Sequence, residues 1–417
     1  MSSKARPSLA RVTAASAAAA IPTATEGDTV HVVGQGRVLS GNCDESNLVY
    51  EWSQIAGDPV NFTAHSPPVD IGTTGAQGEL AFRLTVSTED GVATASDDFA
   101  IMLEASLCEA TIIDLGTLPG KEGASLNVGG INDAGQVVGR SGNAYLWQDG
   151  VMTDLGTAGG SASQALAINE YGFVTGFVKV PQNHAAMFDG GAIDLGFVDG
   201  QCGGCNSIMC DVNDDEDMVG HAEFTSPSHV LRPVLRRVDG TVEFLDIDGF
   251  SGGIARGINS AGDIAIVADN CDAYDTGKTG SGFISHADGS VTTLGQLGGY
   301  AYCYPRDISD SGYATGYASN SPSLTRAFLW LDGVMTDIGT LGGSSQAFHV
   351  NEAGHAVGKS NGRAFIYRGT MTDLNDLLPE ASGWTLQSAN DINNVGQVVG
   401  IGLHGGQKRV FLMTLCD

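Results

Sequence analysis

The chain has 417 residues, of which 59 are Gly, and its 48 Asp and Glu residues against 20 Lys and Arg give a formal net charge of −28. This length allows two domains, and so much negative charge excludes nucleic acid as a partner because backbone phosphates would be repelled. The sequence contains no apolar run of 18 or more residues, so we expect no transmembrane segment.

Residues 1–24 are the first distinct segment. They carry Lys4, Arg6 and Arg11, followed by the Ala-rich stretch VTAASAAAA (12–20). A basic start before a short apolar stretch is typical of a secretory signal, and a flexible linker is the alternative. The sequence does not decide whether this segment is cleaved.

Residues 25–105 form a predicted domain of their own. LVYEWSQIAGDPVNF (48–62) and GELAFRLTVSTEDGVATASDDFAIMLEA (78–105) alternate apolar and polar residues around turns such as TEDG (88–91). This pattern, with Trp52 on a central strand, favours an immunoglobulin-like β-sandwich. The same segments resemble PKD-type domains of bacterial surface proteins, and the resemblance implies a spacer or adhesion module.

A short phrase then recurs seven times, with Ile or Val before an Asn, a Gly three residues after the Asn, and a second Gly four residues later. The Asn positions are 37 to 50 residues apart and are Asn132, Asn169, Asn213, Asn259, Ser309 (in place of Asn), Asn351 and Asn393. A period of this length made of short strands is the signature of a β-propeller blade. The third repeat has Glu216 in place of the first Gly, and the fourth has Ile266 in place of the second.

Each repeat predicts four short strands. The Asn begins a tight turn through a hydrogen bond to its own backbone, and the first Gly takes the positive φ that the turn needs. The third strands, such as AYLW (144–147) and AFLW (327–330), supply bulky residues that we expect between adjacent blades.

The two ends of the repeat region complement each other. TIIDLGTL (111–118) matches the fourth strand of a repeat, whereas the seventh repeat stops after its third strand at VFLMTLCD (410–417). Residues 106–417 are therefore predicted to form a seven-bladed β-propeller of four-stranded blades, an all-β ring closed by its N-terminal strand. Because Cys108 and Cys416 flank the closing strands, we predict a disulfide between them, around a loop where cross-linking is most stabilising.

The tokens DLGTLxGxxxxAxxINxxGQVVG and AFLWxDGVMTDLGTLGG resemble the HAF-type extracellular repeat family of bacteria, over about residues 110–417. The resemblance implies an extracellular or cell-surface location of bacterial type. It implies no established activity, so no functional residue is carried over from it.

Eight cysteines favour an oxidising compartment. Cys271 and Cys303 lie in loops that we expect on one face of the propeller, and we predict a disulfide between them. Cys202, Cys205 and Cys210 cluster before the third repeat, where two of them are expected to pair. A zinc site completed by His221 or His229 is the alternative there, and Cys43 has no evident partner.

The longest loops, 221–233 and 269–282, share that face, and loops on a rigid scaffold carry function. We expect a binding surface there for a glycan or a surface protein. Its aromatic contacts are predicted to be Tyr274, Tyr300, Tyr302 and Tyr304.

The segment DVNDDED (211–217) is a candidate calcium site, although no cofactor is required by the sequence. Asp211, Asn213, Asp215 and Asp217 place oxygen ligands at alternate positions, as calcium loops do. The segment lacks the Gly and the distal Glu of such loops.

The residues two before each Asn position would form a ring in the central channel if the first strand is innermost. They are Gly130, Ala167, Asp211, Gly257, Asp307, His349 and Asp391, with Arg256 and Arg306 one residue earlier in their repeats. Carboxylates with a His near Arg can perform acid/base chemistry. A concave pocket that holds His349 within hydrogen-bond reach of Asp307 or Asp391 would favour catalysis over binding.

Repeats without a nucleophile elbow, phosphate loop or paired metal motif favour a non-enzymatic protein for adhesion, ligand binding or extracellular structure. The alternatives are an enzyme acting on acidic or neutral polysaccharide at the channel, and a self-assembling filament subunit that docks through its front domain or N-terminal segment.

Overall fold

The structure is a computed structural model that describes residues 11–16, 23–25, 29–32, 34–40, 48–56, 61–62, 69–72, 78–88, 94–104, 110–197, 206–224, 230–269, 280–321 and 324–415. Within these ranges the chain is almost entirely β, and a single 3-10 turn, η2 (Leu374–Leu377), is the exception. Among the described helices none is long and apolar enough to cross a membrane. The chain divides into two compact units, residues 1–108 and 109–417.

The first unit contains three sheets in its described part. Their orders are β1-β4, β2-β9-β8-β5 and β3-β7-β6. The strands are β1 (Arg11–Ser16), β2 (Thr23–Thr25), β3 (Thr29–Val32), β4 (Gly34–Ser40), β5 (Leu48–Ala56), β6 (Asn61–Phe62), β7 (Val69–Gly72), β8 (Gly78–Thr88) and β9 (Thr94–Glu104).

This first unit differs from the sequence prediction in two respects. Arg11–Ser16 pairs antiparallel with Gly34–Ser40, so part of the segment 1–24 belongs to the unit's sheets. Trp52 lies on β5, which ends the described four-stranded sheet instead of lying inside it. On β8, Phe82, Leu84 and Val86 are fully buried at alternate positions. The immunoglobulin-like topology stays a prediction.

The second unit contains seven four-stranded antiparallel sheets in the described ranges. Sheets one to three are β11 (Leu126–Ile131), β12 (Val137–Ser141), β13 (Asn143–Gln148), β14 (Val151–Gly156); β15 (Ser163–Ile168), β16 (Val174–Val180), β17 (Gln182–Phe188), β18 (Ala192–Gly196); and β19 (Ser207–Val212), β20 (Met218–Phe224), β21 (Val230–Arg236), β22 (Val242–Phe244). Sheets four to six are β23 (Gly252–Ile258), β24 (Ile264–Asp269), β25 (Ser281–Ser285), β26 (Val291–Thr293); β27 (Tyr302–Ile308), β28 (Ala314–Ser321), β29 (Leu324–Leu331), β30 (Val334–Asp337); and β31 (Ser345–Val350), β32 (Ala356–Ser360), β33 (Arg363–Tyr367), β34 (Met371–Asp373). Sheet seven is β35 (Trp384–Ile392), β36 (Gln397–His404), β37 (Gln407–Thr414) and β10 (Thr111–Asp114).

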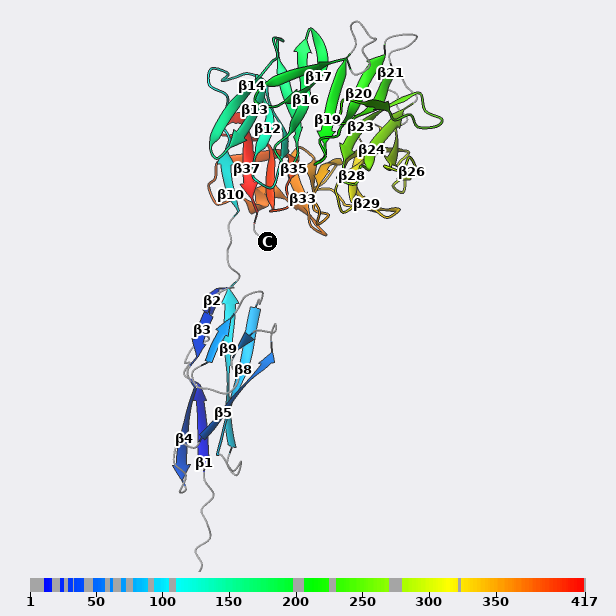
Figure 1. The fold of residues 1–417 in the computed structure, drawn as a ribbon. Coiled ribbons are helices and arrows are strands. Elements are labelled where there is room, and N and C mark those ends of the chain that lie inside the picture. The colour runs from blue at the N-terminus through cyan, green and yellow to red at the C-terminus, as the bar shows by residue number, and fades with distance from the viewer. Residues whose placement is uncertain are drawn as a thin grey trace, which may run out of the picture. The chain divides into compact units, whose positions relative to one another are not determined.

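These sheets form a closed, propeller-like ring. Each first strand contacts the first strand of the next sheet, from β11 through β35, and β35 contacts β11 again. The predicted closing strand is present: β10 pairs antiparallel with β37, with Thr111 opposite Thr414 and Asp114 opposite Phe411 (Figure 1). This pairing completes the four strands of sheet seven with a strand from the other end of the ring.

The core lies between adjacent sheets. Tyr145 of the third strand of sheet one is fully buried against Val399 and Val410 of sheet seven. Phe365 of sheet six occupies the same place against Ala327 and Ile338 of sheet five. The bulky third-strand residues thus fill the space between sheets, as predicted.

A circle of Asn side chains joins consecutive sheets. The side-chain amide of each repeat Asn donates a hydrogen bond to the backbone carbonyl of the Asn position in the next sheet. The six links are Asn132 to Asn169 (3.1 Å), Asn169 to Asn213 (3.0 Å), Asn213 to Asn259 (3.2 Å), Asn259 to Ser309 (3.1 Å), Asn351 to Asn393 (3.2 Å) and Asn393 to Asn132 (2.9 Å). These side chains also accept from the N–H four residues on, as Asn132 does from Gln136. The Asn is therefore more than a turn residue.

Sheet five breaks this circle. The hydroxyl of Ser309 is buried and has no hydrogen-bond partner in the described part of the chain. The carbonyl of Asn351, which would receive the seventh link, already accepts from Gly354 N–H and keeps a second lone pair. Ser is too short to complete the circle.

The two glycines of the phrase have separate roles. The first takes a positive φ, as at Gly135 (74°), and Glu216 adopts the same conformation at 63° in sheet three. The second lies where strands approach closely: a Cβ on Gly220 would sit 1.9 Å from the Ile208 carbonyl oxygen. In this sheet a side chain at that position would displace the first strand, whereas sheet four has Ile266 there.

We predict that Ser309→Asn stabilises the protein, because it completes the circle with a buried amide-to-carbonyl hydrogen bond. The expected gain in unfolding free energy is about 1 kcal/mol, seen as a rise in Tm of roughly 1–3 °C by calorimetry. The matched reverse variant, Asn351→Ser, removes one link and should lower Tm. An unchanged or lower Tm for Ser309→Asn would contradict this account.

Candidate functional site

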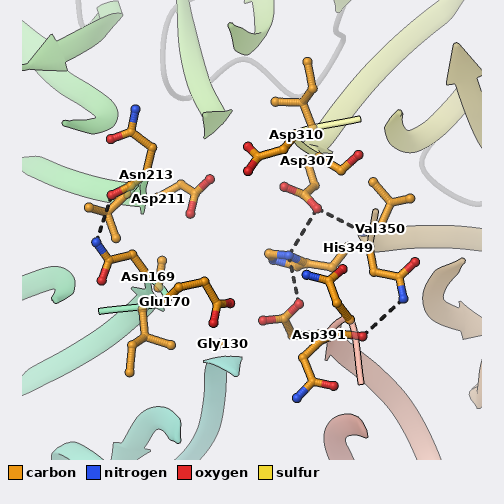
Figure 2. Close-up of a pocket in the computed structure, with 18 of the residues that line it drawn as sticks. Gly130, Asn169, Glu170, Asp211, Asn213, Asp307, Asp310, His349, Val350 and Asp391 are labelled. Carbon is orange, nitrogen blue, oxygen red and sulfur yellow. Dashed lines mark hydrogen bonds and ion pairs between the residues drawn. The ribbon is translucent and has the colours of Figure 1, made fainter. Parts of the chain in front are cut away.

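A pocket of about 170 Å³ lies at the end of the ring where the Asn turns gather (Figure 2). Gly130, Ala167, Asp211, Asp307, His349 and Asp391 line it, which are six of the seven residues predicted to form a ring in the channel. They lie near the ends of the first strands of sheets one, two, three, five, six and seven. The prediction that the first strand is innermost is therefore consistent with this pocket.

A β-bulge in every first strand positions these residues. The pairing register shifts at Val128/Ile131, Ala165/Ala167, Met209/Asp211, Ala255/Gly257, Pro305/Asp307, Ala347/His349 and Ala389/Asp391. A bulge bends its strand and re-aims a side chain. Sequence reasoning missed this feature, although a Gly inside a strand, as at the second Gly of the phrase, signals one.

The three carboxylates of the pocket each bond the next sheet. Asp211 accepts from Ile258 N–H (2.9 Å), Asp307 from Val350 N–H (2.9 Å) and Asp391 from Ile131 N–H (2.8 Å). Each bond joins a first strand to the first strand of its neighbour. The carboxylates are consequently fixed in place by the ring itself.

His349 lies between two of these carboxylates (Figure 2). Its Nδ1 is 3.1 Å from Asp391 Oδ1 and 3.3 Å from Asp307 Oδ2, and the His349 side chain is 31 % exposed. This is the geometry that we set out as favouring acid/base chemistry, a concave pocket with His349 in reach of both carboxylates.

The pKa values of the four groups move apart. Burial opposes the charge on His349, but Asp391 and Asp307 outweigh it and raise its pKa to about 10. Burial, with the charge of Asp307, raises the pKa of Asp211 to about 7. Burial raises that of Asp391 to about 6. Burial also opposes the charge on Asp307, but His349 outweighs it and holds the Asp307 pKa below its usual value. At neutral pH His349 is therefore a cation.

An acidic rim, formed by the residue after each Asn position, surrounds the pocket. Its members are Asp133, Glu170, Asp214, Ser260, Asp310, Glu352 and Asn394. Six of these side chains, all but that of Ser260, accept from a backbone N–H group of the preceding sheet, as Glu170 does from Asp133 (3.0 Å) and Asp133 from Asn394 (2.7 Å). Sequence reasoning missed this rim, although its signal was a short polar or acidic residue in all seven repeats.

The predicted calcium ligands do not converge. Asp211 bonds Ile258 N–H in the channel, and Asn213 belongs to the Asn circle. Asp215 is exposed in the turn. Asp217 is buried and pairs with Arg237 at 2.8 Å. In the described ranges no three His, Cys, Asp or Glu side chains form a group that could hold a metal ion. The segment therefore serves the ring's own hydrogen bonds.

The predicted tyrosines have different surroundings. Tyr300, Tyr302 and Tyr304 are half-buried, and Tyr304 stacks on Tyr317 with ring centroids 5.0 Å apart. Tyr274 lies outside the described residues. Of the three described tyrosines, none lines the channel pocket.

The structure does not support the predicted Cys271–Cys303 bond. Cys303 is a free thiol, 1 % exposed, packed among Ile284, Leu294 and Phe328. Burial raises its pKa to about 12, so the thiol is unreactive there. Cys210 is also free. The other cysteines proposed to pair or to bind zinc, together with His229, lie outside the described residues: Cys43, Cys108, Cys202, Cys205, Cys271 and Cys416.

No protein-family model matches the chain, and no curated protein matches it. Similar solved structures include TolB from Acinetobacter baumannii, with TM-score 0.38, 11% identity, and coverage of 87% of this chain and 79% of that one. Another is the extracellular domain of the proposed hybrid two-component system BT3049 from B. thetaiotaomicron, with TM-score 0.44, 11% identity, and coverage of 79% of this chain and 43% of that one. Both likenesses are too distant to assign a function.

We predict that His349→Gln changes how stability depends on pH. The raised pKa of His349 means that its contribution is complete below pH 6.5, the pKa of the unfolded side chain, and is lost as pH rises towards 10. The wild-type advantage in unfolding free energy over the variant should be about 1–3 kcal/mol smaller at pH 9 than at pH 6.

Chemical denaturation at both pH values measures this difference. The matched control is His286→Gln, which removes a His paired with the single carboxylate of Asp263 at 2.9 Å, outside the channel pocket. If the unfolding free energy depends on pH equally in the control, or if His349→Gln does not change its pH dependence, then the charge of His349 has no particular role in stability.

Proposed function

We propose that the protein is a secreted or cell-surface binding protein, in which the seven sheets are the blades of a β-propeller and the acidic channel pocket is the ligand site. The observation that carries this proposal is the pocket itself. The acidic rim and the carboxylates of Asp211, Asp307 and Asp391 surround a cavity of about 170 Å³ on a closed ring of sheets. A site held on a rigid scaffold is preorganised for binding.

The chemistry of the pocket favours a positively charged group. Burial raises the pKa of Glu170, and the charges of Asp133, Asp214 and Asp391 raise it further, although the backbone N–H of Asp133 works in the opposite direction. A cation in the pocket would relieve the repulsion among these carboxylates. The small volume suits one amine or guanidinium group, such as a Lys or Arg side chain of a surface protein.

The location and the role of the front unit rest on sequence. Secretion or display on a bacterial cell follows from the HAF-type resemblance, and a spacer or adhesion role for residues 25–105 follows from the PKD-type resemblance. Self-association is the variant of this proposal in which the cationic group comes from a second copy of the chain.

We predict that a tetralysine peptide binds the full chain at low ionic strength and that tetraglutamate does not. The double variant Glu170→Gln/Asp214→Asn should weaken tetralysine binding at least about fivefold, because two rim charges are lost. Titration calorimetry at two salt concentrations measures this, since exposed charge pairs are screened.

The matched control is Glu380→Gln, an exposed carboxylate that does not line the pocket. If all three proteins bind tetralysine equally, the attraction comes from net charge alone and the pocket is not the site.

A second candidate, an enzyme acting on polysaccharide, is favoured by one observation. The pocket holds carboxyl groups whose pKa values are driven apart, with Asp211 raised to about 7 and Asp307 lowered. Such a pair supplies the acid and the base of glycoside hydrolysis. The acidic rim would repel an acidic polymer, so the substrate would be neutral.

This candidate predicts release of reducing sugar from a neutral polysaccharide, with activity falling above pH 7 as Asp211 loses its proton. Asp211→Asn should reduce the rate at least about a hundredfold. Absence of release from a panel of neutral glucans, galactans and mannans would reject it, and equal rates in wild type and Asp211→Asn would place any activity elsewhere.

A further inference from the structure

Two arginines occupy equivalent places in neighbouring sheets. Arg256 on β23 and Arg306 on β27 each directly precede a residue of the predicted ring, at the β-bulge of the first strand. The two strands contact each other. A Cβ on Gly257 would lie 2.9 Å from the Cα of Asp307, so these two residues of β23 and β27 lie directly next to each other. The side chains one residue earlier therefore start side by side.

Neither guanidinium has a carboxylate partner in the described ranges, where the ion pairs involve other arginines. The nearest acids along the chain are committed elsewhere, since Asp307 bonds Val350 N–H and His349. Burial and the neighbouring charge of Arg256 both lower the pKa of Arg306. Adjacent cations without a carboxylate partner are costly and unexpected in a chain with a net charge of −28.

A buried His lies next to Arg256, with the carboxylate of Glu223 nearby, and one of its ring nitrogens has no hydrogen bond to the described residues. His221 is 9 % exposed, and its Nδ1 has no hydrogen bond within the described part of the chain. Arg256 lies near both His221 and Cys210, since it acts on the pKa of each group and hydrogen-bonds the Cys210 thiol. Burial and the charge of Arg256 lower the pKa of His221 to about 4. The neutral ring can offer one N–H to a ligand.

An aromatic wall adjoins the arginines. Tyr304 and Tyr317 are paired across β27 and β28 and stack with an interplanar angle of 21°. The guanidinium carbon of Arg306 lies 5.5 Å from the centre of the Tyr317 ring, and the guanidinium group donates a hydrogen bond to the Tyr317 hydroxyl oxygen. This contact fixes the plane of the guanidinium group. The oriented guanidinium group of Arg306 therefore lies beside the stacked rings of Tyr304 and Tyr317.

We propose that Arg256, Arg306 and His221 form a binding site for the carboxylate of an acidic sugar. The planar guanidinium groups match a carboxylate through paired hydrogen bonds, His221 adds a neutral donor, and the tyrosine pair provides a wall for the sugar ring. An anion would also remove the repulsion between the two arginines. The site is separate from the acidic pocket and takes a ligand of opposite charge, so either site can fail without the other.

The test is titration calorimetry of the full chain with a galacturonic acid trimer, with a neutral galactose trimer as the matched ligand. The uronate should bind and the neutral trimer should not. Arg306→Gln and Arg256→Gln should each weaken uronate binding at least tenfold, and Arg306→Lys should also weaken it because the fork is lost. Arg232→Gln is the control, because Arg232 already pairs with Asp246.

Thermal unfolding without ligand separates binding from a structural role. Removing one of two repelling cations should leave Tm unchanged or raise it in both Gln variants, whereas arginines that hold the fold together would give a Tm several degrees lower. Equal binding of the neutral trimer, unchanged binding in the Gln variants, or binding of inorganic phosphate without any uronate binding would overturn the proposal.

Discussion

The hydrogen bond from one repeat Asn to the backbone carbonyl of the next Asn position is the constraint on which the ring depends. It fixes how far apart and at what height consecutive first strands lie, because both its ends are buried close to the backbone. A buried amide and a buried carbonyl must both be satisfied, so each sheet holds its neighbour in one position. Six such links, with bonds from Asp211, Asp307 and Asp391, set the size of the channel.

The same constraint explains why charge gathers at one end of the ring. Because the first strands are held in alignment, side chains at equivalent positions in neighbouring repeats lie close together, and this does not depend on their charge. Asp307 and Asp391 are brought to His349 in this way, and the acidic rim forms one step further along the chain. The arginines show the opposite result at the bulge, where Arg256 meets Arg306 and not an acid. Function in such a ring depends on substitutions at a few equivalent positions.

The architecture was largely predictable because it depends on spacing. Local patterns that repeat predict the seven sheets, the four strands of each sheet and the closing strand. His349, Asp307 and Asp391 were expected at the same height in the channel because each lies two residues before the Asn position of its repeat. The hydrogen bonds between sheets were not predictable, because a spacing of 37 to 50 residues does not say which atoms meet. The second hydrogen bond of each Asn and the rim at Glu170 were missed for that reason. The calcium prediction took Asp217 as a ligand, whereas a distant Arg237 pairs with it.

The pairing of β10 with β37 sets a delay during synthesis. Thr111 pairs with Thr414, which is 414 − 111 = 303 residues later in the chain. At ribosomal rates of about 5–20 residues per second, β10 waits roughly 15–60 s before its partner exists. During that time an open strand edge remains on the growing array of sheets, and such edges invite aggregation. A chaperone that covers β10, or export of the chain before folding, would protect the array until the ring closes.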